Sequence, residues 1–284
     1  RLLPLMQQIY GNWSVVAGSH AALNDVVDLL DQPFPQYYFE NEPQPLEIKD
    51  SFSVNKLSFR YSESSPWVLD DISFEIMKGS RLGLIGTTGS GKSTTLDLLM
   101  GLLEPTHGEL IVDNLKIDDS SIRAWRQTVA HVPQSIFLAD TSIAENIAFG
   151  VLPEKINMLQ VKDAAKKAMI DDFIESRPNG YAEVVGERGV RLSGGQRQRI
   201  GIARALYKQA NVIVFDEATS ALDNETEKVV MEAIRNLGEE LTLIIVAHRL
   251  STLENCTHII ELDQGKILRI GSYDEIINHT RSTT

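Results

Sequence analysis

The sequence predicts an α/β fold with a mainly parallel β-sheet, preceded by a long helix. Two short, β-branched apolar runs, NVIVFDE at 211–217 and TLIIVAH at 242–248, are bounded by polar residues, as buried parallel strands are. Helical patterns occupy 161–177 and 225–237. A third apolar run, at 80–86, leads into a glycine-rich loop. Strands that alternate with helices in this way are typical of an α/β domain.

The first element is a helix over residues 5–30. Its apolar, aromatic and histidine side chains recur at steps of three, four and seven, which describes one face of an amphipathic helix about 40 Å long: Leu5, Ile9, Trp13, Val16, His20, Leu23, Val27 and Leu30. Pro33 and Pro35 end it at Asp31. Two interpretations remain open on the pattern alone: a helix packed on the following domain, or the last part of a helix from an upstream region.

Residues 32–45 contain four prolines and scattered acids, which indicates an extended linker. From residue 46 the pattern changes to strands and turns. Alternating segments predict strands at 51–61 and 71–76, before the strand at 80–86.

Composition excludes some functions. The formal net charge of −12 and the lack of a basic stripe argue against a protein that binds the nucleic-acid backbone. The chain has one cysteine, Cys256, which excludes an internal disulfide and fits a reducing compartment. Because Cys256 lies beside the apolar run THIIEL, we expect a buried structural thiol. There is no run of 18 apolar residues.

Residues 86–93, GTTGSGKS, satisfy the P-loop pattern in full and lie between a predicted strand and a helical run. The glycines permit a turn whose N–H groups form a nest for phosphate oxygens. Lys92 would contact the β- and γ-phosphates, and the Ser93 hydroxyl would bind Mg²⁺. The predicted phosphate site comprises Gly86, Thr87, Thr88, Gly89, Ser90, Gly91, Lys92, Ser93 and Thr94.

Two carboxylates follow the apolar strand that begins at Val212. Asp216 emerges at the strand end, where it would hold Mg²⁺, through water. Glu217 is the candidate base that orients and deprotonates an attacking water. In the P-loop context the pair predicts phosphoryl chemistry.

A second anion site is predicted at LSGGQ, residues 192–196. Ser193 and Gln196 have the spacing of a capping box at a helix start, with Gly194 and Gly195 leaving the backbone open to close approach. A helix N-terminus of this kind would bind an anion, although the chain already has the P-loop.

In this context LSGGQ, followed 20 positions after Gln196 by Asp216, resembles the signature of ATP-binding-cassette (ABC) proteins. The resemblance covers nearly all of 46–284 and implies further roles. Tyr61 would stack on adenine, Gln134 would sense Mg²⁺ and water, Asp223 is similar to the D-loop aspartate, and His248 to the switch histidine at the γ-phosphate. The resemblance implies that the catalytic residues are Glu217, His248 and Gln134. It implies that Ser93, Gln134 and Asp216 bind the metal.

The resemblance also implies an architecture and a partner. The fold would be a P-loop NTPase core with an antiparallel β subdomain and a helical signature subdomain, using ATP and Mg²⁺. Two copies would associate head to tail, so that Ser193, Gly194, Gly195 and Gln196 of one copy cap the γ-phosphate held by the P-loop of the other. The second anion site is then half of a shared site.

Within the family, the chain resembles exporters with a fused membrane domain. Only 58 positions separate Gln134 from Leu192, too few for the coiled-coil insertion of DNA-repair relatives, and a single acidic cassette does not fit translation factors. The helix and linker before the first strand, and GERG at 186–189, are similar to exporter features. We expect 137–149 to form the groove floor for the membrane domain.

The resemblance divides the chain into the cytoplasmic end of the last transmembrane helix (1–31), the linker (32–45) and the ABC ATPase domain (46–284). It places the ATPase at the cytoplasmic face of a membrane, powering export of a lipid, glycolipid, peptide or drug, with no nucleic-acid partner. The abrupt start at Arg1, without a methionine, suggests a fragment or a processed product, and we expect this fragment itself to be soluble. Two alternatives stay open: an importer ATPase subunit, and a dimerisation module without transport.

Overall fold

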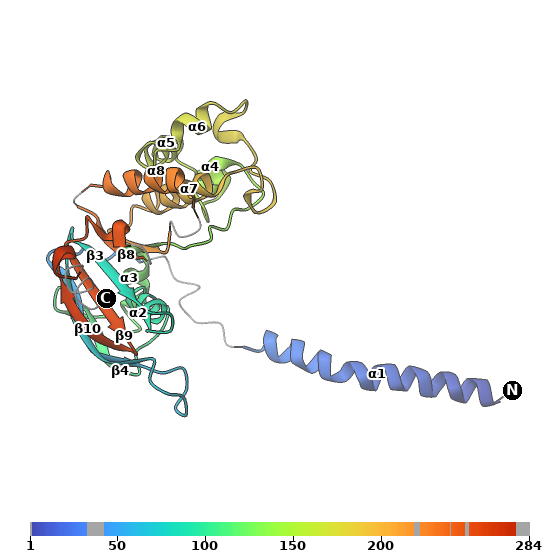
Figure 1. Cartoon of the computed structure of the whole chain (residues 1–284). Coiled ribbons are helices and arrows are strands. Elements are labelled where there is room, and N and C mark those ends of the chain that lie inside the picture. Colours follow the sequence, from blue (N-terminus) through green and yellow to red (C-terminus); the bar gives the residue numbers. More distant parts are fainter. Residues whose placement is uncertain (1, 33–42, 219–221, 239, 248–249, 277–284) are drawn as a thin grey trace. The chain divides into compact units, whose positions relative to one another are not determined.

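The computed structural model describes residues 2–32, 43–218, 222–238, 240–247 and 250–276 (Figure 1). Two compact units make up the chain, Arg1–Glu42 and Pro43–Thr284.

The first unit consists of helix α1, Leu2–Leu30, which confirms the predicted helix. Apolar residues also occupy positions outside the predicted stripe, so the helix is less amphipathic than the spacing indicates: Leu3, Met6, Tyr10, Val15, Val26 and Leu29. In the described part of the chain, no helix combines the length and apolar character needed to span a membrane.

The second unit is built around a six-stranded sheet in the order β10-β9-β3-β8-β7-β6. Five strands are parallel, and β10 at one edge is antiparallel to β9. The strands are β3 (Arg81–Gly86), β6 (Val129–Val132), β7 (Val212–Asp216), β8 (Thr242–Val246), β9 (His258–Asp263) and β10 (Lys266–Gly271). The mainly parallel sheet confirms the predicted fold class.

Both faces of this sheet are buried. Ile213 and Phe215 of β7 belong to a core shared with the helices. Val212 and Val214 belong to a second core, shared with the other sheet. Burial on both faces explains why β7 and β8 are continuous apolar runs rather than alternating ones.

A smaller antiparallel sheet has the order β2-β1-β4-β5. Its strands are β1 (Ser51–Phe59), β2 (Leu69–Met77), β4 (His107–Val112) and β5 (Leu115–Lys116). The pairing of β1 is irregular between Val54 and Leu57, where Lys56 has a positive φ of 50°. The expected antiparallel β subdomain is therefore present.

In the second unit, helices α2 (Lys92–Leu99) and α3 (Ile122–Thr128) lie beside the strands, whereas its other α-helices form a separate group (Figure 1). This second group comprises α4 (Ile143–Ile147), α5 (Met158–Lys167), α6 (Asp171–Glu175), α7 (Gly194–Tyr207) and α8 (Asn224–Arg235). The sequence pattern at 161–177 predicts one continuous helix, but the helix is interrupted between α5 and α6. Met169 has a φ of 55° there, and its backbone cannot continue the helix.

Cys256 is buried, as expected from the neighbouring apolar run. Its sulfur lies near β3, because a Cβ added at Gly83 would be 3.3 Å from the Cys256 Sγ. Burial raises the pKa of the Cys256 thiol to about 12, although Arg81 lowers it in part. The thiol is therefore protonated and unreactive in the folded protein at neutral pH.

This pKa predicts an alkaline loss of stability. Above an ordinary thiol pKa of 9.0, the unfolded chain releases a proton that the folded chain keeps up to about pH 12. The contribution is fully present below pH 9, and the free energy of unfolding then falls by at most about 1.4 kcal/mol per pH unit. Urea unfolding at several pH values should show a steeper decline for the wild type than for Cys256→Ala. Equal slopes would contradict the buried thiol.

Candidate functional site

The P-loop connects the carboxyl end of β3 to α2. Gly86 has a φ of 150°, and a Cβ at this position would lie 2.2 Å from the Leu262 carbonyl oxygen. Gly89 has a φ of 81°, and an added Cβ would have nothing within 4 Å. Glycine is therefore favoured here by the backbone conformation of the turn and not by crowding. The loop thus has the backbone that the motif predicts.

Lys92 is the first residue of α2 and is only 7% exposed. Its Nζ donates hydrogen bonds to the carbonyl oxygens of Gly86 (2.8 Å) and Thr87 (2.9 Å). Burial lowers the pKa of Lys92, and the nearby carboxylates of Glu217 and Asp216 oppose that shift. A buried ammonium is therefore held across the loop, beside two acids.

The two acids lie where the sequence predicted them, at the carboxyl end of β7. Burial raises the pKa of Asp216, and the Glu217 charge adds to the increase, while His131 acts in the opposite direction. Glu217 has a φ of 49°, and its backbone N–H donates to the Val246 carbonyl oxygen at 3.1 Å. A residue whose backbone is held in this sparsely populated region of φ and ψ is common at functional sites.

Lys92 and Glu217 line one cavity of about 210 Å³, whereas Asp216 is not part of its lining. The lining joins residues of the P-loop and of α2 to the acid that follows β7: Val68, Thr88, Gly89, Gly91, Lys92, Ser93, Thr94 and Glu217. Sequence reasoning missed Val68, which precedes β2 and donates its N–H to the Phe59 carbonyl oxygen at 2.9 Å. Its only signal was its nearness to Tyr61 in the chain.

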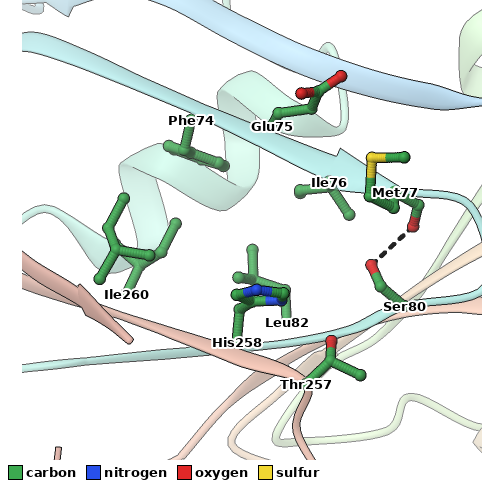
Figure 2. Close-up of a pocket in the computed structure, with 10 residues that line it drawn as sticks. Phe74, Glu75, Ile76, Met77, Ser80, Leu82, Thr257, His258 and Ile260 are labelled. Carbon is green, nitrogen blue, oxygen red and sulfur yellow. Dashed lines mark hydrogen bonds between the residues drawn. The ribbon is translucent and has the colours of Figure 1, made fainter. Parts of the chain in front are cut away.

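Two larger cavities lie elsewhere. One of about 280 Å³ is lined by Phe74, Ile76, Leu82 and Ile260, with Ser80 and His258 beside them (Figure 2). Another, of about 430 Å³, includes Asn211 and Leu241. Ser80, His258, Asn211 and Leu241 precede or begin β3, β9, β7 and β8 in turn, so both cavities adjoin the amino ends of parallel strands. Ligands of open α/β sheets bind at the carboxyl ends, which favours the P-loop cavity.

Tyr61 is exposed, with its Oη 3.4 Å from the Thr94 Oγ1. The Phe59 ring supports it edge-on, with ring centroids 5.0 Å apart. The aromatic ring therefore lies near the start of α2, close to the cavity, and presents a surface that a flat base would cover.

The signature residues begin α7 but do not line this cavity. Ser193 is the N-cap, and its Oγ accepts the Gln196 N–H at 3.3 Å. The Gln196 Oε1 accepts the Ser193 N–H at 2.8 Å. Both halves of the predicted capping box are present.

The remaining predicted residues are only partly described. Asp223 is the N-cap of α8, and its carboxylate accepts the N–H groups of Glu225 and Thr226, which lower its pKa. Gln134 follows β6 and is exposed. His248 lies outside the described residues.

The donors present fit a metal-bound triphosphate. The Ser90 Oγ is buried without a hydrogen-bond partner among the described residues, as a donor awaiting an oxygen ligand would be. The Asp216 carboxyl is kept from ionising easily by burial and by Glu217, a cost that a divalent cation would remove. In the described ranges, no group of three or more His, Cys, Asp or Glu residues forms a metal site by itself. A metal here would need other ligands, such as phosphate oxygens.

The chain is similar to known proteins. The model of the family described as "ABC transporter" matches residues 69–220. An "ATP-dependent lipid A-core flippase" of Alkalilimnicola ehrlichii is 39% identical over 279 residues, covering 98% of this chain and 47% of the relative. A "Beta-(1-->2)glucan export ATP-binding/permease protein NdvA" of Bartonella bacilliformis is 37% identical, covering 96% and 45%.

A solved structure, that of a bacterial Atm1-family ABC exporter with ATP bound, has a TM-score of 0.75 and 36% identity to this chain. The match covers 83% of this chain and 41% of that one. The chain thus spans about half the length of the curated relatives it matches. The family match extends from β2 through the P-loop and signature to residue 220, beyond β7, so the chain belongs to the ABC transporter family, as a nucleotide-binding domain of the exporter type.

Proposed function

We propose that this chain is the ATP-hydrolysing domain of an ABC exporter and acts at the cytoplasmic face of a membrane. The observation that carries the proposal is the cavity in which Lys92, Ser93 and Glu217 meet. The similar proteins named for lipid A-core and glucan export support a lipid, glycolipid or glycan as cargo, ahead of a peptide or drug. Direct measurement of phosphate release distinguishes this ATPase from a module that only dimerises on ATP.

Within the site, we assign each group one task. The P-loop N–H groups and Lys92 would bind the β- and γ-phosphates, and Tyr61 would stack on adenine. Ser93, Gln134 and Asp216 would hold Mg²⁺, which when bound neutralises charge on the phosphate oxygens. Glu217 would accept a proton from the attacking water, while His248 stabilises charge on the transferred phosphoryl group.

The second substrate-binding element belongs to another copy of the chain. Since the signature residues do not line the P-loop cavity, a head-to-tail dimer would bring them to the γ-phosphate of the partner. Closure of this dimer would draw the attached membrane domains together, and hydrolysis would release it.

The N-terminal region fits the same proposal. Residues 1–31 would be the cytoplasmic end of the last transmembrane helix, 32–45 a linker, and 46–284 the ATPase. The apolar residues on several sides of α1 support this division, because a helix with such a surface needs covering on more than one side. Exposed Phe137 and Phe149 support a groove that receives the membrane domain.

The first test concerns the proposed base. Glu217→Gln removes the proton acceptor but keeps the side chain's size. ATP hydrolysis should fall by roughly 100-fold or more, while an ATP-bound dimer accumulates in size-exclusion chromatography with Mg²⁺ and ATP. Hydrolysis at the wild-type rate would exclude Glu217 as the base.

The second test separates two roles of the signature serine. Ser193 and Ser142 cap α7 and α4 with the same capping-box geometry. Alanine at either position should reduce the free energy of unfolding by about 1 kcal/mol, measured in urea. Only Ser193→Ala should also reduce ATP hydrolysis, by about 100-fold. Equal activity in the two variants would show that Ser193 is only a cap.

The third test concerns the dimer. Ser193→Cys and Thr88→Cys are introduced into a Cys256→Ala chain, which is then oxidised with MgATP. The head-to-tail arrangement predicts a covalent dimer on a non-reducing gel. Linkage found only within single chains would rule the arrangement out.

A further inference from the structure

The two signature glycines are not required by their backbone conformation. Gly194 and Gly195 begin α7 and are absent from the glycines with positive φ. Alanine is a much better helix former than glycine. Some contact, rather than the turn of the chain, must therefore explain glycine at these positions.

At Gly195, the contact is made by Thr226 of the same chain. An added Cβ would lie 1.9 Å from the Thr226 Cγ2, a distance that no packing tolerates. The next nearest atoms, the Thr226 Cβ and Oγ1, would be 3.4 and 3.9 Å away, which is ordinary contact. At Gly194 the added Cβ would meet only Leu222, at 3.1 Å. The single methyl group of Thr226 thus excludes a side chain at position 195.

The hydroxyl of the same side chain is bound to the D-loop aspartate. The Thr226 Oγ1 donates to the Asp223 Oδ2 at 2.8 Å, and the Thr226 N–H donates to the Oδ1 at 3.0 Å. Thr226 is partly buried between the two elements. One residue, on the first turn of α8, therefore contacts the first turn of α7 with its methyl group and holds the Asp223 cap with its hydroxyl.

We propose that Thr226 is a positioning residue that couples the signature helix to the D-loop of the same chain. The coupling rests on the proposed function, in which the nucleotide of the partner copy is met by Ser193–Gln196. A shift of the first turn of α7 would be passed through the methyl contact to Thr226 and then, through the hydroxyl, to Asp223. The alternative is that Gly195 is small only to admit the partner's phosphate.

A double-mutant cycle separates these explanations. Gly195→Ala should reduce kcat for ATP in the full 284-residue chain, because its Cβ collides with the Thr226 methyl group. Thr226→Ser removes that methyl group and keeps the hydroxyl. The double variant Gly195→Ala/Thr226→Ser should therefore have a kcat at least about tenfold higher than that of Gly195→Ala alone. Thr226→Val keeps a methyl group and removes the hydroxyl, so Gly195→Ala/Thr226→Val should show no recovery.

A second readout distinguishes coupling from packing. Thr226→Val alone should lower kcat while KM for ATP is unchanged, because the P-loop cavity is untouched. Thermal unfolding of every variant without nucleotide reports the packing. The proposal is overturned if Thr226→Ser restores the melting temperature of Gly195→Ala without restoring kcat, or restores neither. If the wild-type chain releases no phosphate, the proposed function fails too; if it does and the cycle fails, only the coupling is wrong.

Discussion

The burial of the Lys92 ammonium is the constraint on which the site depends. Lys92 is only 7% exposed, so its charge must be compensated within the protein. The carbonyl oxygens of Gly86 and Thr87 accept hydrogen bonds from its ammonium group. Asp216 and Glu217 supply negative charge nearby. A triphosphate carries more negative charge than either carboxylate. Its oxygens would therefore bind the Lys92 ammonium more strongly than the two carbonyl oxygens do, and would replace them.

The parallel sheet makes this arrangement possible. Because both faces of β3, β7 and β8 are covered, polar groups can emerge only at the strand ends, and the carboxyl ends meet along one edge. The P-loop and Glu217, 126 residues after Gly91, thus line one cavity. Each signal was local in the sequence, so strands β1, β2, β3, β7 and β8, the P-loop and the Ser193 capping box were predictable from residue type and spacing, whereas the other strands were not predicted.

Long-range packing was not predictable in this way. Val68 is an ordinary apolar residue, and only the fold brings it beside Gly91, whose added Cβ would lie 3.1 Å from the Val68 carbonyl oxygen. The break at Met169 was hidden by a sequence whose propensity remains helical on both sides. The prediction of an amphipathic α1 was wrong for a different reason. Positions that fit one apolar stripe can be found even in a helix that has apolar residues on several sides, such as Tyr10 and Val26.

The signature shows the same limit within a recognised motif. From the sequence alone, the glycines of LSGGQ leave room for an anion, which local chemistry allows. In the folded chain, the space beside Gly195 is already filled by Thr226, and 31 positions separate the two residues. A small residue can therefore satisfy two neighbours at once. In the proposed dimer, Thr226 would already hold the start of α7 on the D-loop side when the partner's nucleotide approaches. The energy of nucleotide contact would then be available to move Asp223 rather than to order the glycines.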